Sequence, residues 1–152
     1  MLAARRRPRV CGGLQLLAAT AFVLAACHRS GAWSDDPRNF ERAWNQPAPT
    51  DLRIAHSWYW RSAHFTREEA YYFQFARHVQ FMRGFIGENA FQPVADATSV
   101  TVSDYSCFSR PIWFAPKPMA AYNAWTAPPN AARAMILEDR ATGDFFISVC
   151  QI

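Results

Sequence analysis

Residues 134–150 have the sequence AMILEDRATGDFFISVC, in which two apolar runs flank the polar segment 139–144. A polar, glycine-containing segment between two apolar runs is typical of a β-hairpin. The sequence therefore predicts two antiparallel strands over 134–138 and 145–150. In the second strand the residues of one face alternate with those of the other: Phe145, Ile147 and Val149 against Phe146, Ser148 and Cys150.

Two further strands and a helix are predicted earlier in the chain. Residues 52–60 alternate between two sides with a period of two, which favours a strand. Residues 69–76 are dense in Tyr and Phe, which favour strands, and we expect a helix over 77–87. The alternative is one long helix that begins at Thr66, because Thr66 and Glu69 match a capping box.

The remaining segments have weaker patterns. The pair Asp36-Pro37 predicts the start of a short helix, because Pro is favoured at the first helical position. We expect residues 88–112 to be a loop around one short strand, Ser99–Val102. Large aromatic residues lie among proline-bounded turns over 113–125.

Together these elements predict a small α+β domain over residues 51–152. We expect one antiparallel sheet of four to five strands, with one or two helices packed on one face of it. The chain contains 12 Phe, 6 Trp and 5 Tyr. A small core built from a few large side chains is consistent with that content.

Residues 1–26 are typical of a secretory signal peptide. Four arginines lie between Arg5 and Arg9, and an apolar run follows them. The stretch from Gly12 to Ala26 is shorter than the roughly 20 residues that a transmembrane helix needs. We therefore expect cleavage, with an uncleaved anchor as the alternative.

The end of this run, Leu24-Ala25-Ala26-Cys27, resembles the lipobox of bacterial lipoproteins. The resemblance implies that a diacylglycerol is joined to the Cys27 sulfur, that the chain is cut before Cys27, and that the new amino group is acylated. The implied organisation is a signal peptide over 1–26, a lipidated N-terminus and tether over 27–50, and the domain over 51–152. The resemblance leaves that domain unassigned. The alternative is an ordinary signal peptide in which this cysteine occurs by chance.

The expected location is the bacterial cell envelope, because two or more acyl chains hold a protein firmly on a membrane. The residue after Cys27 is His28 rather than Asp. By resemblance to the lipoproteins of enteric bacteria, this implies the outer membrane, facing the periplasm. Arg5-Arg6 suggests twin-arginine export as an alternative route, but the usual flanking residues of that signal are missing.

The formal net charge of the chain, +4 at pH 7, comes from the leader. Without residues 1–26 the 16 Lys and Arg fall to 12, which equals the 12 Asp and Glu. Proteins that bind nucleic acid normally carry a concentrated positive field. We therefore expect no nucleic-acid partner.

The chain has 4 cysteines, of which Cys11 leaves with the leader and Cys27 is the expected lipidation site. Cys107 and Cys150 remain as a pair in an oxidising compartment, so we expect them to form a disulfide. Such a bond is worth roughly 3–4 kcal/mol by the chain-entropy argument. The alternative, a catalytic thiol, lacks an adjacent His or basic residue that would lower its pKa.

Motifs for catalysis or metal binding are scarce. His56 and His64 are farther apart than the tight histidine pairs of zinc sites. We expect His56 to be a hydrogen-bonded core residue on the same face as Leu52 and Trp58, and we expect no metal site. No nucleophile elbow, P-loop or dinucleotide-binding fingerprint occurs in the sequence. We therefore expect neither a cofactor nor an enzyme.

The most suggestive group is Trp58-Tyr59-Trp60-Arg61. Exposed Trp and Tyr beside an Arg stack on sugar rings or anchor a protein partner. The ordinary interpretation, which we adopt for the fold, places Trp58 and Trp60 in the core with Tyr59 as their outward neighbour.

The resulting expectation is a membrane-anchored envelope lipoprotein with a non-enzymatic interaction or structural role and an envelope protein as its partner. The alternative is a binding module for cell-wall glycan, lipid or a small ligand, which requires Trp58, Tyr59 or Trp60 to be exposed in a groove. An enzyme is a third hypothesis. It requires a deep pocket that holds His56 or His64 beside a carboxylate.

Overall fold

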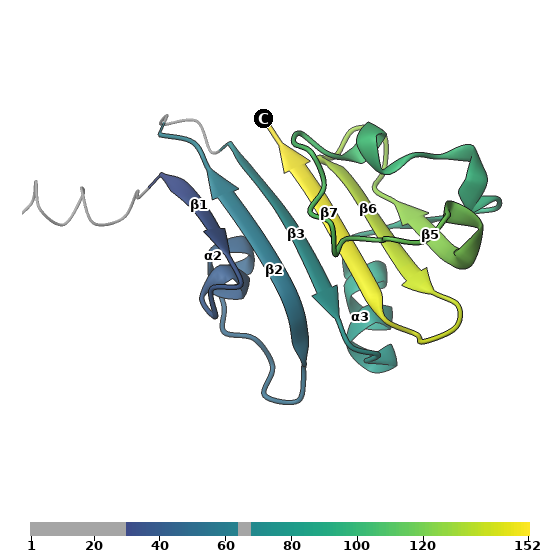
Figure 1. The fold of residues 1–152 in the computed structure, drawn as a ribbon, viewed down its shortest axis with the longest axis horizontal. Coiled ribbons are helices and arrows are strands. Elements are labelled where there is room, and N and C mark those ends of the chain that lie inside the picture. Colours follow the sequence, from purple (N-terminus) through teal and green to yellow (C-terminus); the bar gives the residue numbers. More distant parts are fainter. Residues whose placement is uncertain (1–29, 64–67) are drawn as a thin grey trace, which may run out of the picture.

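The computed structural model describes residues 30–63 and 68–152, which form one seven-stranded antiparallel sheet with two α-helices (Figure 1). The strand order is β1-β2-β3-β7-β6-β5-β4. Strands that follow one another in the chain are thus neighbours in the sheet, with one exception: β3 and β4 lie apart, and β3 pairs with β7 instead. The predicted signal peptide, Cys27 and His64 lie outside the described residues.

The strands and the helix with the strongest sequence patterns are confirmed, as β2, β3, α3, β6 and β7. Residues 69–75 form a strand, so the alternative of one long helix from Thr66 is wrong. In chain order the elements are β1 (Gly31–Ser34), α2 (Asn39–Trp44), β2 (Ile54–Arg61), β3 (Glu69–Phe75), α3 (Val79–Glu88), β4 (Gln92–Val94), β5 (Tyr122–Thr126), β6 (Arg133–Asp139) and β7 (Phe145–Gln151).

The α+β class is confirmed, but the expected four to five strands are too few. The sequence prediction missed β1, β4 and β5, which are short. β4 contains Pro93, which lacks a backbone N–H and is tolerated in a sheet only at an edge. β4 does lie at the edge of the sheet, and β1 lies at the opposite edge.

The predicted strand Ser99–Val102 is wrong, because two short 3₁₀ helices occupy this stretch, Ala97–Ser99 and Val102–Tyr105. Local side chains take the backbone N–H groups that a strand would need. Asp96 Oδ1 accepts a hydrogen bond from the Thr98 N–H at 2.9 Å, and Asp104 Oδ2 accepts one from the Thr101 N–H at 3.2 Å.

Most of the expected tether belongs to the fold. β1 pairs with β2, with Trp33 opposite Tyr59. In α2, Phe40 is 2% exposed and packs in the core. The side chain of Asn39 donates hydrogen bonds to the Trp33 carbonyl and to Ser57 Oγ, which ties α2 to both strands. The folded domain therefore includes residues 31–44 in addition to the expected 51–152.

The sheet separates two hydrophobic cores. α2 and α3 cover one face, and residues 95–121, which we call the cover loop, lie over the other (Figure 1). The predicted alternation of β7 is confirmed, because its odd-numbered residues face the helices and Phe146 faces the cover loop. The largest fully buried side chains on the helix side are Phe40, Tyr59, Phe73, Phe75, Met82, Ile136 and Ile147. Those on the other side include Tyr72, Phe114, Tyr122, Met135, Leu137 and Phe146.

The turn between β6 and β7 is organised by the buried carboxylate of Asp139. Its Oδ1 accepts hydrogen bonds from the backbone N–H groups of Ala141, at 2.9 Å, and Thr142, at 3.3 Å. Its Oδ2 accepts a hydrogen bond from the ammonium group of Lys117, at the end of the cover loop. The Lys117 ammonium group lowers the pKa of Asp139, and the two backbone donors contribute in the same direction.

Asp139 should make the stability of the domain sensitive to acid. Its pKa is lower in the folded protein than in the unfolded chain, so it stabilises the fold above the unfolded value and loses this effect as the pH falls through the folded value. We expect Asp139→Asn to reduce the free energy of unfolding in urea at pH 7 and to have a progressively smaller effect at acidic pH, as the pH falls through the folded pKa of Asp139. Asp144→Asn, in the same turn, is the matched control. An equal loss at pH 7 and at acidic pH would contradict this role.

Candidate functional site

Strand β2 carries a row of half-buried rings on the face of the sheet that the helices leave open. Successive side chains of a strand point to opposite faces. On the cover-loop side β2 presents His56, Trp58 and Trp60, which we call the aromatic stripe. Ser57 and Tyr59 alternate with them and are buried on the helix side.

Each ring of the aromatic stripe touches an aromatic side chain of the cover loop. The His56 ring stacks on Trp113, with ring centroids 5.3 Å apart. Trp58 and Trp60 both contact Phe108, at centroid distances of 5.6 and 4.8 Å. The cover loop therefore ends along β2, and the stripe forms its border.

On the other side, towards the edge of the sheet, the described neighbours of Trp58 and Trp60 are small. Ser34 of β1 lies opposite Trp58, and Ala32 lies opposite Trp60, and both are exposed. Ala70 of β3 flanks Trp60 on its inner side. Trp60 therefore lies between two alanines of the neighbouring strands. Small residues flank Trp58 and Trp60 on the outer side, so a binding partner can reach these two rings from there.

Phe108 is held in place by its neighbours in the fold. Cys107 and Cys150 form a disulfide across a sequence separation of 43 residues, with Cα atoms 5.4 Å apart, as the sequence predicted. The Tyr72 hydroxyl donates a hydrogen bond to the Phe108 carbonyl at 2.7 Å. Burial raises the pKa of Tyr72, so its hydroxyl stays protonated and remains a donor. These two attachments fix the ring that contacts the stripe.

The expected orientation of the Trp58–Arg61 group is wrong. Tyr59 is fully buried on the helix side, where its ring stacks on Tyr71 and its hydroxyl donates a hydrogen bond to Glu69 Oε2 at 2.9 Å. Trp58 and Trp60 are the partly exposed members. Arg61 lies at the end of β2, opposite Gly31 and Glu69. Of the four candidate contact residues, only Tyr59 is closed to a partner.

His56 is also not the core residue that the alternation predicted. The β2–β3 register shifts between Ile54 and His56, which places Leu52 and Ile54 in the helix-side core and turns His56 to the other face. Its Nδ1 lies 3.3 Å from Asp35 Oδ2, and the two side chains are 44% and 55% exposed. The pair is at the surface, where water competes with the interaction.

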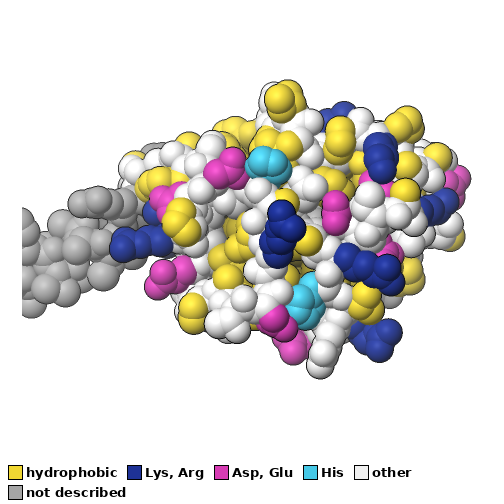
Figure 2. Space-filling model, turned by 60° about the horizontal axis from the view of Figure 1, so that its bottom comes forward, with side chains coloured by type: hydrophobic (Ala, Val, Ile, Leu, Met, Phe, Trp, Pro, Cys, Tyr) yellow, Lys and Arg dark blue, Asp and Glu magenta, His cyan; other side chains and the backbone are white. Residues whose placement is uncertain are grey.

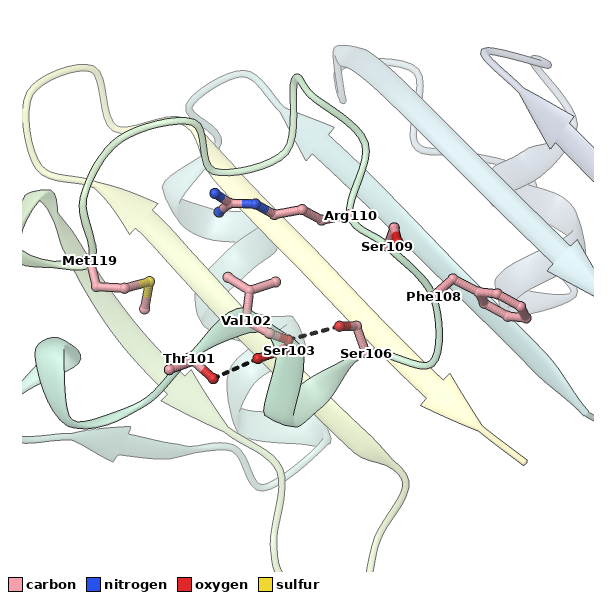
Figure 3. A pocket seen from close by; sticks show the side chains of 8 residues that line it. All are labelled: Thr101, Val102, Ser103, Ser106, Phe108, Ser109, Arg110 and Met119. Carbon is pink, nitrogen blue, oxygen red and sulfur yellow. Dashed lines mark hydrogen bonds between the residues drawn. The ribbon is translucent and has the colours of Figure 1, made fainter.

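Beside Phe108, residues within 101–110 and Met119 of the cover loop line an open cavity of about 350 Å³ (Figure 3). Val102 and Met119 are its apolar lining. The polar lining consists of Thr101, Ser103, Ser106, Ser109 and Arg110. One guanidinium nitrogen of Arg110 donates a hydrogen bond to the Ala115 carbonyl at 3.0 Å. The cavity therefore offers hydroxyl and guanidinium donors next to an aromatic ring.

A second groove, of about 360 Å³, lies between α2 and α3 and has Trp44 and Phe81 among its apolar lining. At its rim, His78 Nδ1 accepts a hydrogen bond from the Phe81 N–H, and Nε2 lies 3.0 Å from Asp51 Oδ2. The hydrogen bond from His78 lowers the pKa of Asp51. Because its Nδ1 accepts this backbone hydrogen bond, His78 serves as the N-cap of α3.

Charged side chains of both signs are interspersed with apolar ones over the face that Figure 2 presents. Within residues 30–63 and 68–152, no three His, Cys, Asp or Glu side chains are grouped closely enough to hold a metal ion. In the same described part of the chain, no helix has the length and apolar character required to cross a bilayer.

Comparisons with models of protein families, with curated proteins and with solved structures gave no match.

Loss of the disulfide should both destabilise the domain and loosen the border of the stripe. For the double variant Cys107→Ser/Cys150→Ser we expect the free energy of unfolding in urea to fall by about 3–4 kcal/mol. Because Phe108 is then held less firmly, quenching of tryptophan fluorescence by acrylamide should increase. Reductant should reproduce both effects in the wild-type protein and change nothing in the variant. An unchanged unfolding midpoint would contradict the structural role of the bond.

Proposed function

We propose that this chain is a lipid-anchored protein of the bacterial cell envelope that acts by binding a protein partner and not by catalysis. The signal-peptide pattern and the motif Leu24–Cys27 support the anchor. The residue after Cys27, His28, favours the outer membrane, with the domain in the periplasm. The disulfide between Cys107 and Cys150 is consistent with an oxidising compartment.

The observation that carries the binding role is the aromatic stripe. Trp58 and Trp60 lie on the same face of β2, along the border of the cover loop, and both are only partly buried. Covering about 50 Å² more of one such ring contributes roughly 1–1.5 kcal/mol. Trp is also enriched among the residues that dominate binding energy at interfaces.

The stripe is also organised before a partner arrives. Trp58 and Trp60 rest on Phe108, which the adjacent disulfide and the Tyr72 hydrogen bond hold in place. A rigid aromatic surface loses little side-chain entropy on binding, and this raises affinity without additional contacts.

The alternative function is a binding module for cell-wall glycan, lipid or a small ligand. The cavity next to Phe108 favours it, because Ser103, Ser109 and Arg110 supply donors there for hydroxyl or anionic groups. An aromatic ring beside hydrogen-bond donors is an arrangement that suits a sugar.

The anchor is tested by replacing Cys27. We expect the wild-type protein to incorporate labelled palmitate and to enter the detergent phase in Triton X-114 partitioning. Cys27→Ala should lose the label and enter the aqueous phase, because no acyl chain then attaches. Cys11→Ala is the matched control and should behave like the wild type. Labelling of Cys27→Ala at the wild-type level would contradict the proposed anchor.

The binding surface is tested by photo-crosslinking in intact cells. A benzophenone amino acid at Ser34, beside Trp58, should crosslink one dominant envelope protein. Trp58→Ala should reduce this adduct at least about tenfold, the equivalent of about 1.4 kcal/mol. Trp125→Ala is the matched control, because Trp125 is also half-buried but packs on the helix side.

Each outcome of this experiment separates the hypotheses. Equal crosslinking in Trp58→Ala and in the wild type would contradict the stripe as the contact. Adducts that contain peptidoglycan fragments instead of a protein would favour the alternative binding module. The melting temperatures of both variants establish that they remain folded.

A further inference from the structure

Four chain segments meet at one end of the sheet. Gly31 at the start of β1 lies opposite Arg61 at the end of β2. Arg61 lies opposite Glu69 at the start of β3, and Glu69 lies opposite Gln151 at the end of β7. Figure 1 shows the chain entering β1 at the same end as the C-terminus. We call this end of the sheet the anchor end.

The chain between the expected lipid and the sheet is short. Only His28, Arg29 and Ser30 separate Cys27 from Gly31. Consecutive Cα atoms advance at most about 3.6 Å, so Cys27 and Gly31 lie within about 14 Å of each other. β2 alone, with 8 residues, is about 27 Å long. A lipid on Cys27 would therefore hold the anchor end near the membrane surface.

Exposed apolar side chains lie at this same end. Ile152, the last residue, is 75% exposed, and Phe108 is 38% exposed. Phe108 belongs here because its ring contacts Trp60, the second-last residue of β2, and its neighbour Cys107 is bonded to Cys150. Half-buried Trp60 completes the group. Aromatic and aliphatic side chains of this kind are stable at the boundary between lipid headgroups and acyl chains.

The charges at the anchor end suit a lipid surface. Arg61 ends β2, and exposed Arg133 starts β6 opposite Cys150. Glu69 is buried and accepts the Tyr59 hydrogen bond, so its carboxylate faces the protein interior. Glu68 is the acidic residue nearer the surface. Among the described residues at this end, the guanidinium groups of Arg61 and Arg133 favour contact with the anionic phosphates of lipid headgroups.

We infer that the anchor end rests on the lipid surface that holds the Cys27 acyl chains, with Ile152 and Phe108 inserted at the headgroup level. The inference rests on the proposed lipidation of Cys27. The aromatic stripe then runs away from the bilayer, from Trp60 through Trp58 to His56. The domain stands with its strands inclined to the membrane, and the turn between β6 and β7 is farthest from it.

Photo-crosslinking to lipid tests this orientation. The full-length lipidated protein carries a benzophenone amino acid at Ile152 and is placed in vesicles of phosphatidylethanolamine and phosphatidylglycerol. Ile112 is the matched control site, because it is an isoleucine that is 96% exposed and is adjacent to Trp113, which stacks on His56. We expect phospholipid adducts at position 152 at least about tenfold above those at position 112.

Partitioning in Triton X-114 before irradiation separates the failure of the anchor from the failure of the orientation. If the protein enters the detergent phase but positions 152 and 112 give equal adducts, or none, the orientation is overturned and the anchor stands. If the protein enters the aqueous phase, lipidation of Cys27 is overturned, and the orientation with it.

Discussion

The pairing of β3 with β7 joins the two halves of the sheet, and the rest of the structure depends on it. The strands run antiparallel from Glu69 opposite Gln151 to Phe75 opposite Phe145. Both strands are buried on both faces along nearly their whole length. A strand buried on both faces needs a layer on each side of the sheet. The helices supply one layer and the cover loop supplies the other.

The cover loop depends on bonds from its side chains and carbonyl groups to the sheet, because it has little regular secondary structure of its own. It contains short 3₁₀ helices and no strand, so few backbone hydrogen bonds hold it to the sheet. β7 provides two of the attachments: Cys150 bonds to Cys107, and the Ser148 hydroxyl donates a hydrogen bond to the Tyr105 carbonyl at 3.0 Å. Both residues lie on the face of β7 that the sequence assigned opposite to Ile147. The position of Phe108, and with it the border of the aromatic stripe, follows from these attachments.

The sequence was sufficient where alternation and turn chemistry agree, as in the hairpin of β6 and β7. It was insufficient for β2, although the strand itself was predicted. Apolar layers cover both faces of the sheet, so a run such as Trp58-Tyr59-Trp60 has no polar face to show which side is buried. The register shift between Ile54 and His56 also exchanges the faces to which the later side chains point, and the alternation of the sequence does not reveal this. The disulfide was predictable because, in an oxidising compartment, Cys107 and Cys150 are the two cysteines left after the leader and the lipidation site are set aside. The position of Phe108 beside the aromatic stripe depends on the tertiary structure and was not predictable.

The direction of β2 links the two proposals. If the anchor end lies on the membrane, each second residue of the strand lies up to about 7 Å farther from it, in the order Trp60, Trp58, His56. A partner embedded in the same membrane would meet Trp60 and Trp58 first. A partner that reaches the domain from the peptidoglycan side would meet His56 and Trp113 first. The membrane-proximal rings, Trp60 and Trp58, are the ones packed on Phe108, which lies next to the disulfide, so their positions depend on the bond between Cys107 and Cys150.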